Sequence, residues 1–437
     1  MTAKRRAPGD GSFYKNAKGL WVGAITVPST NGRQRRITVS AKDRNEARRK
    51  MREKRAQIDA GTLPTAPKMT VAQWLEHWLE DICKPRVKPK TFNYYRDAVN
   101  LHLIPHIGKK RVATLTQADV RALHRTVQAY SSRCAVQAHQ ALQKALTDAE
   151  REGYVARNVA KLTDKPKHIA HDRGSLTADA ARHLIKTAID RGDPLATRWA
   201  AAFMTGARPG ELLGLTWDRV DLERGLVDLS WQLQEFQKVH GCEVITRDGG
   251  VITYACGKHR AGWCPHARWD FPPGFEFTPC HGSMVWTRPK THAGRRAVPL
   301  APPLLAMLRE HAKMYQSATN PHQLVWHHNG KPISPRDDRE AWVAACEGAG
   351  LAKRCADDAV SSPAKRNRRR NVEWEIEPPA LYVTRHTAAT LLMAAGVPEQ
   401  TRMRIMGQSS VEAHRGYVHV DHELTRAAVA ELGGLAG

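Results

Sequence analysis

The stretch Thr205-Gly206-Ala207-Arg208-Pro209-Gly210-Glu211-Leu212 separates two segments with helical character. An apolar helix that includes residues 199–204 is expected to end at Gly206, because glycine commonly ends helices. A second helix is expected to begin at Pro209, since proline suits the first helical position. Arg208 therefore precedes a helix N-terminus, and both its guanidinium and the helix dipole favour an anion such as phosphate. The alternative for this arginine is a surface salt bridge.

Further motifs with chemical potential lie toward the C-terminus. They are Thr287-Arg-Pro-Lys290-Thr-His-Ala-Gly-Arg-Arg, Tyr382-Val-Thr-Arg385-His386-Thr, Met406-Gly407-Gln408-Ser409-Ser410 and Tyr417-Val-His419. Arginines bind a phosphodiester through charge-assisted hydrogen bonds, a lysine can protonate a leaving oxygen, and a tyrosine can act as a nucleophile. These segments together with Arg208 therefore supply the side chains needed for chemistry at phosphorus.

The composition points to a folded protein with a polyanionic partner. Its 437 residues include 68 Lys+Arg and 43 Asp+Glu, a net charge of +25. The length predicts about three domains, and the surplus of positive charge favours nucleic acid as the partner. General basicity of the whole sequence is the alternative. With no apolar run of about 18 residues and no signal-like N-terminus, we expect a cytoplasmic, nucleoid-associated protein with no membrane partner.

Residues 1–62 are predicted to form a small basic domain. Its β-branched and aromatic runs, at 11–15, 20–27 and 36–40, are separated by turn sequences, and a helical pattern follows at 42–61. This pattern predicts a three-stranded antiparallel sheet backed by a helix, a unit that can place strands in a DNA groove. A basic helix that merely faces solvent is the alternative.

Residues 67–165 are predicted to form a helical bundle. Thr70 and Gln73 have the spacing of a capping box. Apolar residues then follow at helical spacing: Val71, Trp74, Leu75, Trp78, Leu79 and Ile82. We expect the two tryptophans to be core residues and not platforms for nucleobases. Further helices are expected at 91–103, 116–129 and 131–153.

Residues 174–437 mix helical patterns with short strands, which predicts an α+β domain. An insertion at about 235–283 holds four cysteines. They are Cys242, Cys256, Cys264 and Cys280, and His259, His266 and His281 lie among them. Four cysteines in a short segment of a cytosolic protein predict a structural zinc ion, whose thiolate ligands would fold a loop with little core of its own. Unliganded thiols are the alternative, since the C-x-x-C spacing is missing.

The order and spacing of these motifs resemble those of the tyrosine recombinases, the phage integrase family, over the whole chain. The family's segment T-G-x-R-x-x-E-[LI] is matched by residues 205–212, and its second arginine segment by Arg385-His386-Thr387. Its tyrosine lies nine residues past the histidine of a G-H-[SA]-S segment, and Tyr417 lies nine past Gln408. Within this family, the motifs resemble those of integrases from actinobacterial phages and plasmids.

The resemblance implies a multidomain protein, mainly α-helical with small β-sheets. Residues 1–62 would bind arm-type DNA, residues 67–165 would be the SAM-like core-binding domain, and residues 174–437 would be the catalytic domain. The implied activity is site-specific integration of a phage or mobile element through a 3′-phosphotyrosyl intermediate. Arg208 and Arg385 would then bind the phosphate, while Tyr417 attacks it and Lys290 acts as general acid, with neither ATP nor metal required.

Two positions depart from the family pattern. Tyr382 stands where the family usually has histidine, and Gln408 stands where it has histidine or tryptophan. A tyrosine with a pKa of about 10 is a poor base at neutral pH, and a glutamine carries no charge. We therefore expect both residues to belong to the catalytic site, with slowed or rearranged proton transfer. His386 has a structural place in the family pattern.

The resemblance also implies partners. These are double-stranded DNA at attachment sites, a homotetramer on that DNA, an excisionase and a DNA-bending host factor. A helix at 424–432 would pack on a neighbouring subunit or on its own domain. Two alternatives stay open: a catalytically attenuated, recombinase-derived DNA-binding protein, suggested by Tyr382 and Gln408, and a type IB topoisomerase, against which the basic N-terminal domain argues.

Overall fold

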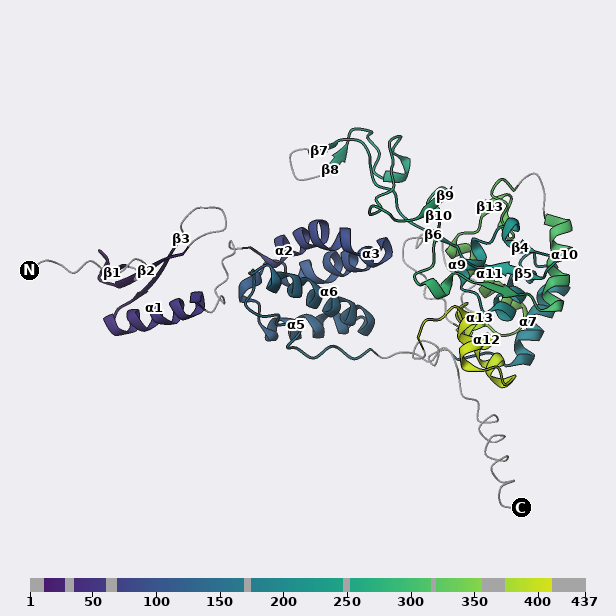
Figure 1. Ribbon diagram of the computed structural model, residues 1–437, viewed down its shortest axis with the longest axis horizontal. Coiled ribbons are helices and arrows are strands. Elements are labelled where there is room, and N and C mark those ends of the chain that lie inside the picture. The colour runs from purple at the N-terminus through teal and green to yellow at the C-terminus, as the bar shows by residue number, and fades with distance from the viewer. Residues whose placement is uncertain are drawn as a thin grey trace, which may run out of the picture. The chain divides into compact units, whose positions relative to one another are not determined.

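The computed structural model describes residues 12–27, 35–59, 69–168, 174–246, 252–315, 320–355 and 374–410. The chain divides into two compact units. One comprises residues 1–170 together with 271–273, and the other comprises the remaining residues. Figure 1 labels β1 to α6 along the first unit and the later elements along the second.

The N-terminal module is the predicted sheet and helix. Its elements are β1 (Ser12–Lys15), β2 (Trp21–Val27), β3 (Arg35–Ala41) and α1 (Arg44–Asp59), and the antiparallel strand order is β1-β2-β3. Asp43 caps the helix by accepting hydrogen bonds from the amides of Asn45 and Glu46 at 2.8 and 2.9 Å. A Cβ at Gly23 would come within 2.7 Å of the Met51 sulfur, so the glycine lets α1 pack directly on β2.

The helical domain follows the predicted order of helices. Its elements are α2 (Val71–His77), the π-helical turn η1 (Trp78–Cys83), the 3-10 turn η2 (Lys84–Arg86), α3 (Pro89–Ala98), the π-helical turn η3 (Val99–Leu103), α4 (Ile104–Ile107), the 3-10 turn η4 (Val112–Thr114), α5 (Gln117–Gln128) and α6 (Ser132–Arg151). The expected capping box forms, since Thr70 and Gln73 exchange hydrogen bonds of 3.0 and 3.2 Å.

The two tryptophans of this domain are core residues, as predicted. Trp74 and Trp78 are buried against α6, and their indole nitrogens donate to the Ala145 carbonyl and to the Asp148 carboxylate at 3.1 and 2.8 Å. Because buried aromatic N–H groups need an acceptor, these two bonds fix the packing of α2 and η1 on α6. Neither ring is free to stack on a base.

The second unit is a mixed α+β structure. Its helices are α7 (Ala178–Asp190), α8 (Ala196–Thr205), α9 (Pro209–Leu213), α10 (Pro302–Tyr315), α11 (Pro335–Gly348), α12 (Val383–Ala394) and α13 (Glu399–Met406). Its strands are β4 (Val220–Asp221), β5 (Leu226–Asp228), β6 (Gln232–Glu235), β7 (Val244–Thr246), β8 (Ile252–Tyr254), β9 (Phe277–His281), β10 (Met284–Thr287), β11 (Ala297–Pro299), β12 (His327–His328), β13 (Lys331–Pro332), β14 (Lys353–Arg354) and β15 (Trp374–Ile376). The strands pair antiparallel in small sheets, two of which have the orders β6-β10-β9 and β11-β5-β4.

Two clusters of buried side chains hold this unit together. One joins α8 and α9 to the two three-stranded sheets and α10, and the other joins α7, α8, α11 and the start of α12. Trp199 and Trp342 belong to the second cluster and meet edge to face with ring centroids 5.4 Å apart. Because α8 contributes to both clusters, its C-terminal end at Thr205 is held firmly in the fold.

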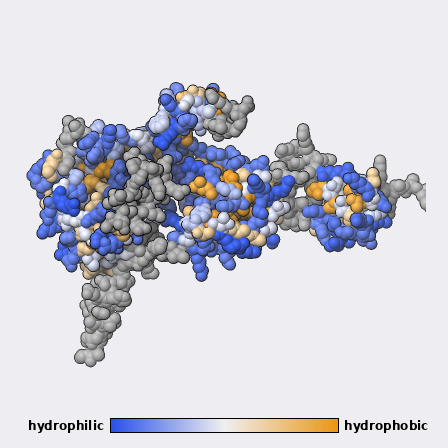
Figure 2. Space-filling view, turned by 180° about the vertical axis from the view of Figure 1, so that it is seen from behind, coloured by the Kyte–Doolittle hydropathy of each residue, from blue (hydrophilic) through white to orange (hydrophobic). Residues whose placement is uncertain are grey.

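The surface of the described residues is predominantly hydrophilic in the view of Figure 2. No described helix is both long enough and apolar enough to cross a lipid bilayer. The predicted nucleophile Tyr417 and the predicted helix at 424–432 lie outside the described residues.

Candidate functional site

Arg208 lies at the N-terminus of α9, as the sequence predicts. Helix α8 ends at Gly206, which has φ +58°, and Pro209 occupies the first turn of α9. The amide and guanidinium of Arg208 donate to the two carboxylate oxygens of Glu211 at 2.9 and 2.7 Å. A second guanidinium nitrogen donates to the Gly407 carbonyl at 3.1 Å. These contacts hold the arginine between α9 and the end of α13.

Glu211 is a buried carboxylate that the sequence analysis did not assign. It accepts hydrogen bonds from Arg296 at 3.0 and 3.2 Å as well as from Arg208. Burial raises the pKa of Glu211, but the charges of Arg296 and then Arg208 outweigh this effect and hold its pKa below the usual range. Glu211 belongs to the Thr205–Leu212 motif, so the sequence could have drawn attention to it. Its partner Arg296 could not be found in that way, because it lies 85 residues further along the chain.

Arg385 lies in α12 and is fully buried. Its guanidinium donates to the carbonyls of Gly206 and Met406. Burial, and next the charge of Arg208, lower the pKa of Arg385 to about 10. The guanidinium nevertheless stays protonated at neutral pH, and the ends of α8 and α13 fix its plane.

Two glycines in left-handed backbone allow this close approach. A Cβ at Gly206 would come within 2.5 Å of the Met406 sulfur, and a Cβ at Gly407 would come within 2.7 Å of an Arg296 guanidinium nitrogen. The latter Cβ would also meet the Ala293 carbonyl oxygen at 3.0 Å. Since only glycine adopts such φ angles without strain, both positions are required where the chain turns around the arginines.

The other predicted catalytic residues lie around the same place or on the loop beside it. Tyr382 precedes α12, with its ring 5.9 Å from that of His386, and it lies within electrostatic reach of Arg385. Gln408 is buried and directly follows Gly407. Lys290 is exposed on the loop from β10 to β11, the same loop whose Ala293 lies against Gly407.

The structure therefore brings Arg208, Tyr382, Arg385 and Gln408 around the C-terminus of α13. Arg208 and Arg296 bond the buried carboxylate of Glu211, and the guanidinium of Arg385 lies close enough to interact electrostatically with all three groups. This arrangement leaves an excess of positive charge fixed by the fold. Such a centre suits a phosphate, whose oxygens accept charge-assisted hydrogen bonds.

The cysteine-rich insertion contains a second centre, with a ligand set that differs from the predicted one. His240, Cys242, Cys256 and Cys264 place their ligand atoms within 4.8 Å of one another. The predicted ligand Cys280 is not a member of this group. Cys280 lies in β9 and packs against the core of the second unit, where burial raises the pKa of its thiol to about 12.

The atoms of this second centre are closely spaced. The Cys242 and Cys264 sulfurs are 3.6 Å apart, and Nδ1 of His240 lies 3.8 and 3.4 Å from the sulfurs of Cys242 and Cys256. All cysteines of the chain are free thiols. Burial raises the pKa of Cys264, but the His266 amide and the neighbouring Cys242 and His240 lower it to about 6. His259, His266 and His281, which the sequence placed near the cysteines, are exposed and lie outside this group.

Gly241 lets the backbone close around this second centre. A Cβ at Gly241 would lie 2.0 Å from the His266 carbonyl oxygen. Next to it, Val239 and Arg268 exchange backbone hydrogen bonds of 2.9 and 3.0 Å. These contacts bring residues 239–242 against residues 264–268. His240 and Cys242 of the first segment therefore lie close to Cys264 of the second.

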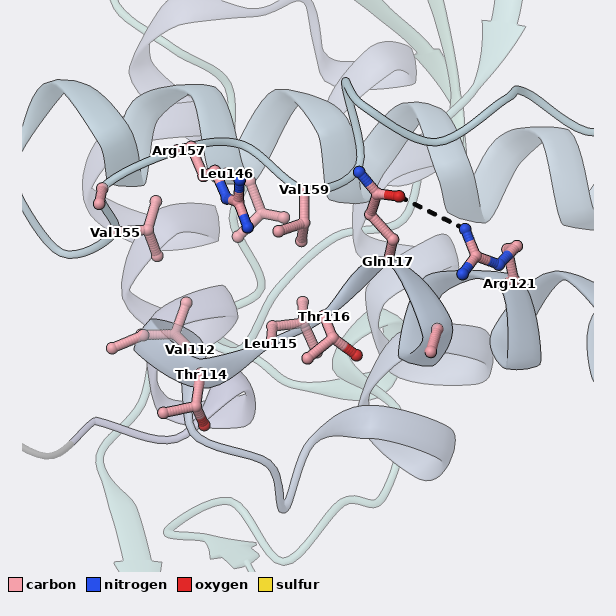
Figure 3. A pocket seen from close by; sticks show the side chains of 13 residues that line it. Val112, Thr114, Leu115, Thr116, Gln117, Arg121, Leu146, Val155, Arg157 and Val159 are labelled. Atoms are coloured by element: carbon pink, nitrogen blue, oxygen red, sulfur yellow. Dashed lines mark hydrogen bonds between the residues drawn. The ribbon is translucent and has the colours of Figure 1, made fainter.

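A pocket of about 620 Å³ lies in the helical domain, apart from these centres (Figure 3). It lies between the segment 112–118 and the turn 155–159, with Leu146 at its wall and Arg121 and Arg157 on its lining. Arg121 donates to Gln117 at 3.4 Å there. None of the predicted site residues that the structure describes lines this pocket.

Comparisons with known proteins agree with this fold. The model of the phage integrase N-terminal SAM-like domain matches residues 70–126. An integrase of Saccharopolyspora erythraea is 28% identical over 439 residues, which cover 95% of this chain and 94% of that protein. A XerC-like tyrosine recombinase of Caldanaerobacter subterraneus subsp. tengcongensis is 22% identical over 97% of this chain and 98% of its own length.

Solved structures show the same architecture. The integrase of the Tn1549 transposon, in complex with a circular intermediate DNA, aligns with a TM-score of 0.57 at 16% identity, covering 83% of this chain and 99% of that chain. Lambda integrase, solved as a dimer bound to a COC′ core site, aligns with a TM-score of 0.51 at 14% identity, covering 95% and 97%. The fold is thus that of the multidomain integrases.

The fold, the domain match and the full-length relatives define the class of protein. Over nearly its whole length the chain is similar to tyrosine recombinases, the family of the phage integrases.

Proposed function

We propose that this protein is a site-specific DNA integrase that exchanges strands through a 3′-phosphotyrosyl intermediate. One observation carries the proposal: Arg208 and Arg385, which lie far apart in sequence, are fixed at the same helix end by the carbonyls of residues 206, 406 and 407. Paired guanidiniums in a fixed geometry stabilise the charge that develops on a phosphoryl group in its transition state.

The proposed reaction is a transesterification. The Tyr417 phenolic oxygen forms a bond to the scissile phosphorus, and the bond from phosphorus to the 5′-oxygen breaks. The phenol loses its proton, while Lys290 gives one to the departing 5′-oxygen, so that a 5′-hydroxyl is left. Because the phosphotyrosyl ester keeps the energy of the broken bond, the reverse attack by another strand needs neither ATP nor a catalytic metal.

Tyr382 and Gln408 have supporting roles in this proposal. Gln408 is buried beside the carbonyl that fixes Arg208, so its amide can donate to a non-bridging oxygen of the phosphate. The hydroxyl of Tyr382 can relay a proton or bond to the phosphate but is a weak base at neutral pH. Since neither residue supplies the charge of a histidine, we expect a slower cleavage step.

The proposal extends to the domains and the partners. Residues 1–62 would bind arm-type sites, residues 67–165 the core site, and residues 174–437 would carry out the chemistry on duplex DNA. Lambda integrase has been solved as a tetramer on a Holliday junction. Four nucleophiles are needed to exchange two strands of each of two duplexes, so we propose a homotetramer here too, assisted by an excisionase and a DNA-bending host protein.

The test is formation of a covalent protein–DNA adduct. Nicked suicide duplexes covering the DNA next to the protein's own gene are incubated with the full chain and resolved by denaturing electrophoresis. We expect one duplex to give an adduct that Tyr417→Phe abolishes. As a matched control, Tyr130→Phe should leave the adduct unchanged, because Tyr130 is an exposed tyrosine of the helical domain that bonds His102.

Binding without any adduct on every duplex tested would contradict the enzymatic proposal. The second candidate, a recombinase-derived DNA-binding protein, would then be preferred, and the departures at Tyr382 and Gln408 are the observations in its favour.

We further propose that the insertion binds one structural zinc ion through His240, Cys242, Cys256 and Cys264. With zinc–sulfur bonds of about 2.3 Å and a zinc–nitrogen bond of about 2.0 Å, a tetrahedral site has sulfur–sulfur and sulfur–nitrogen edges of about 3.8 and 3.5 Å. The measured separations of 3.6, 3.4 and 3.8 Å agree with these edges. Three thiolates and one imidazole are a common set for structural zinc.

Zinc would supply stability that the insertion otherwise lacks. Among the described residues from 237 to 270, Cys264 is the one buried hydrophobic side chain. A buried leucine contributes about 1.5–3 kcal/mol, whereas a structural zinc site in a small peptide contributes about 10–16 kcal/mol.

Metal analysis of the purified full chain tests the zinc proposal. We expect one zinc ion per chain, lost in Cys264→Ser and His240→Ala but retained in Cys280→Ser. Retention in the last variant separates this ligand set from one that uses all four cysteines of the insertion. Wild-type protein without zinc, prepared in zinc-containing medium, would contradict the proposal.

A further inference from the structure

The segment that begins at Cys256 and continues past Cys264, two of the proposed zinc ligands, carries an unusual surface. The whole insertion is balanced in charge, with five basic and five acidic residues from 235 to 283. The segment 256–269, however, holds Lys258, Arg260 and Arg268 and no acidic residue. All three side chains are exposed. We name this group, together with Trp263, the knuckle surface.

The basic residues of the knuckle surface differ from three exposed basic residues on helices of the same unit. Arg182, Lys313 and Arg336 each pair with a carboxylate of their own helix at 2.7–2.8 Å. Within the described part of the chain, the knuckle surface has no ion pair of this kind. Its positive charge is therefore available to an external anion.

Trp263 adds an aromatic face to this charge. Its side chain is 62% exposed, the highest value for any tryptophan that the structure describes, and the Arg260 guanidinium lies 5.0 Å from its ring centroid. The exposed indole therefore offers a flat aromatic face on which a sugar or a base can stack. Arginine beside an exposed aromatic ring is a combination that suits nucleic acid, where phosphates meet the charge and sugars or bases meet the ring.

The second centre holds this surface in place. Lys258 lies two residues after Cys256, and Arg260 lies four before Cys264. Arg268 is tied by backbone hydrogen bonds to Val239, the neighbour of His240. Figure 1 shows the insertion leaving the second unit beside β6, β9 and β10, and the segment has almost no core. A metal ion is then the main restraint on the relative positions of the three basic side chains.

We propose that the knuckle surface is an additional DNA-binding surface, which contacts the phosphate backbone of duplex DNA when the second centre is loaded with metal. The proposal rests on the integrase function only in taking DNA as the partner. It assigns to the insertion a role that is separate from cleavage: it adds affinity, and not base specificity, since phosphate contacts carry no sequence information.

The test uses the salt dependence of binding. The full chain is titrated against a fluorescent 40-base-pair duplex of unrelated sequence at several NaCl concentrations. Each phosphate contact contributes about −0.9 to the slope of log K against log salt. We expect K258Q/R260Q/R268Q to reduce the magnitude of the slope by about 2–3 and to weaken binding about tenfold or more at 100 mM NaCl. Its zinc content should be unchanged.

The matched control is R182Q/K313Q/R336Q, which removes the same charge from the paired residues. We expect its slope to stay within about 0.5 of wild type. Trp263→Ala should weaken binding several-fold without changing the slope, because the ring makes no ionic contact. Cys264→Ser should lose the metal and show the slope of the triple knuckle variant.

Equal slopes for the two triple variants would overturn the DNA contact. A wild-type slope in metal-free Cys264→Ser would overturn its dependence on metal. Neither outcome touches the integrase proposal, because that proposal is judged by the Tyr417 adduct and these measurements record binding alone.

Discussion

The two centres of the second unit are built in opposite ways. At the arginine centre, Arg208, Glu211, Arg296 and Arg385 come from segments separated by up to 177 positions in sequence. The last three are buried, and Arg208 is half-buried against them. At the cysteine centre, all four ligand residues lie within 25 positions and are surrounded by exposed chain. The first centre depends on the packing of the whole domain, whereas the second, in our zinc proposal, would be held by local chelation.

The two centres are vulnerable to different substitutions. Buried charges that neutralise one another are costly to separate, because a lone charge in a core is poorly solvated. A chelated loop depends instead on its ligands and on the backbone that spaces them. A change at one centre should therefore leave the other nearly untouched, and the predictions that follow test this independence.

The largest effect is expected from Glu211→Gln. Removing this carboxylate leaves Arg208 and Arg296 without their shared partner, which we expect to cost about 3–5 kcal/mol of unfolding free energy and to abolish adduct formation. Thermal and urea unfolding measure the loss, and the zinc content should not change. Glu276→Gln is the control: it removes a half-exposed partner of Arg288 and should cost less than about 1 kcal/mol.

The same substitution should change the pH dependence of stability. Because the folded-state pKa of Glu211 is lowered, its contribution is present above the ordinary glutamate pKa of about 4.3 and is lost as the pH falls through the lower folded-state value. The free energy of unfolding of the wild type should therefore fall on acidification by the contribution of Glu211. In Glu211→Gln this part of the fall should be missing. Parallel acid curves for the two proteins would contradict this assignment.

A large effect on catalysis with a small effect on stability is expected from Arg208→Lys. Lysine keeps the positive charge but lacks the planar guanidinium, whose separate nitrogens donate to Glu211 and to the Gly407 carbonyl and can also donate to a phosphate. We expect the rate of adduct formation to fall about 10²–10³-fold, as for loss of one transition-state donor. Arg336→Lys, on the exposed face of α11, should retain the rate. A fall of less than about tenfold would argue against a phosphate-binding role.

A pair of glycine substitutions compares the two centres directly. Gly407→Ala is expected to cost about 1–3 kcal/mol, because alanine is strained at φ +61° and its Cβ meets Arg296, and to slow adduct formation. Gly241→Ala is expected to lower zinc content while sparing adduct formation, because its Cβ meets the His266 carbonyl. Gly262→Ala, which meets nothing within 4 Å, is the control for both. Loss of zinc in Gly407→Ala would show that the centres are coupled.

The smallest effect is expected from Gln408→His. A histidine here is positively charged below its ordinary pKa of about 6.5 and can then strengthen binding of the transition-state phosphate. We expect adduct formation to rise two- to tenfold at pH 6 and to match wild type at pH 8. A pH-independent rate, or a slower one at pH 6, would show that Gln408 is not a deficient substitute for the family's histidine.

Much of the fold could be read from the sequence because its signals are local. Turn residues and β-branched runs predicted β1 to β3, the Thr70–Gln73 spacing predicted the capping box, and Pro209 predicted the start of α9; the structure confirms each. The roles of Arg208, Lys290, Tyr382, Arg385, Gln408 and Tyr417 stay predictions.

The tertiary structure decided which distant groups meet. Sequence spacing could not reveal that Arg296 pairs with Glu211, because a buried ion pair is selected by packing and not by separation along the chain. Nor could it show that His240 and not Cys280 joins the three other cysteines of the insertion. Cys280 packs against the domain core from β9, whereas Nδ1 of His240 lies 3.4 Å from the Cys256 sulfur. Chelation depends on atoms converging within a few ångströms, and only the folded backbone determines that convergence.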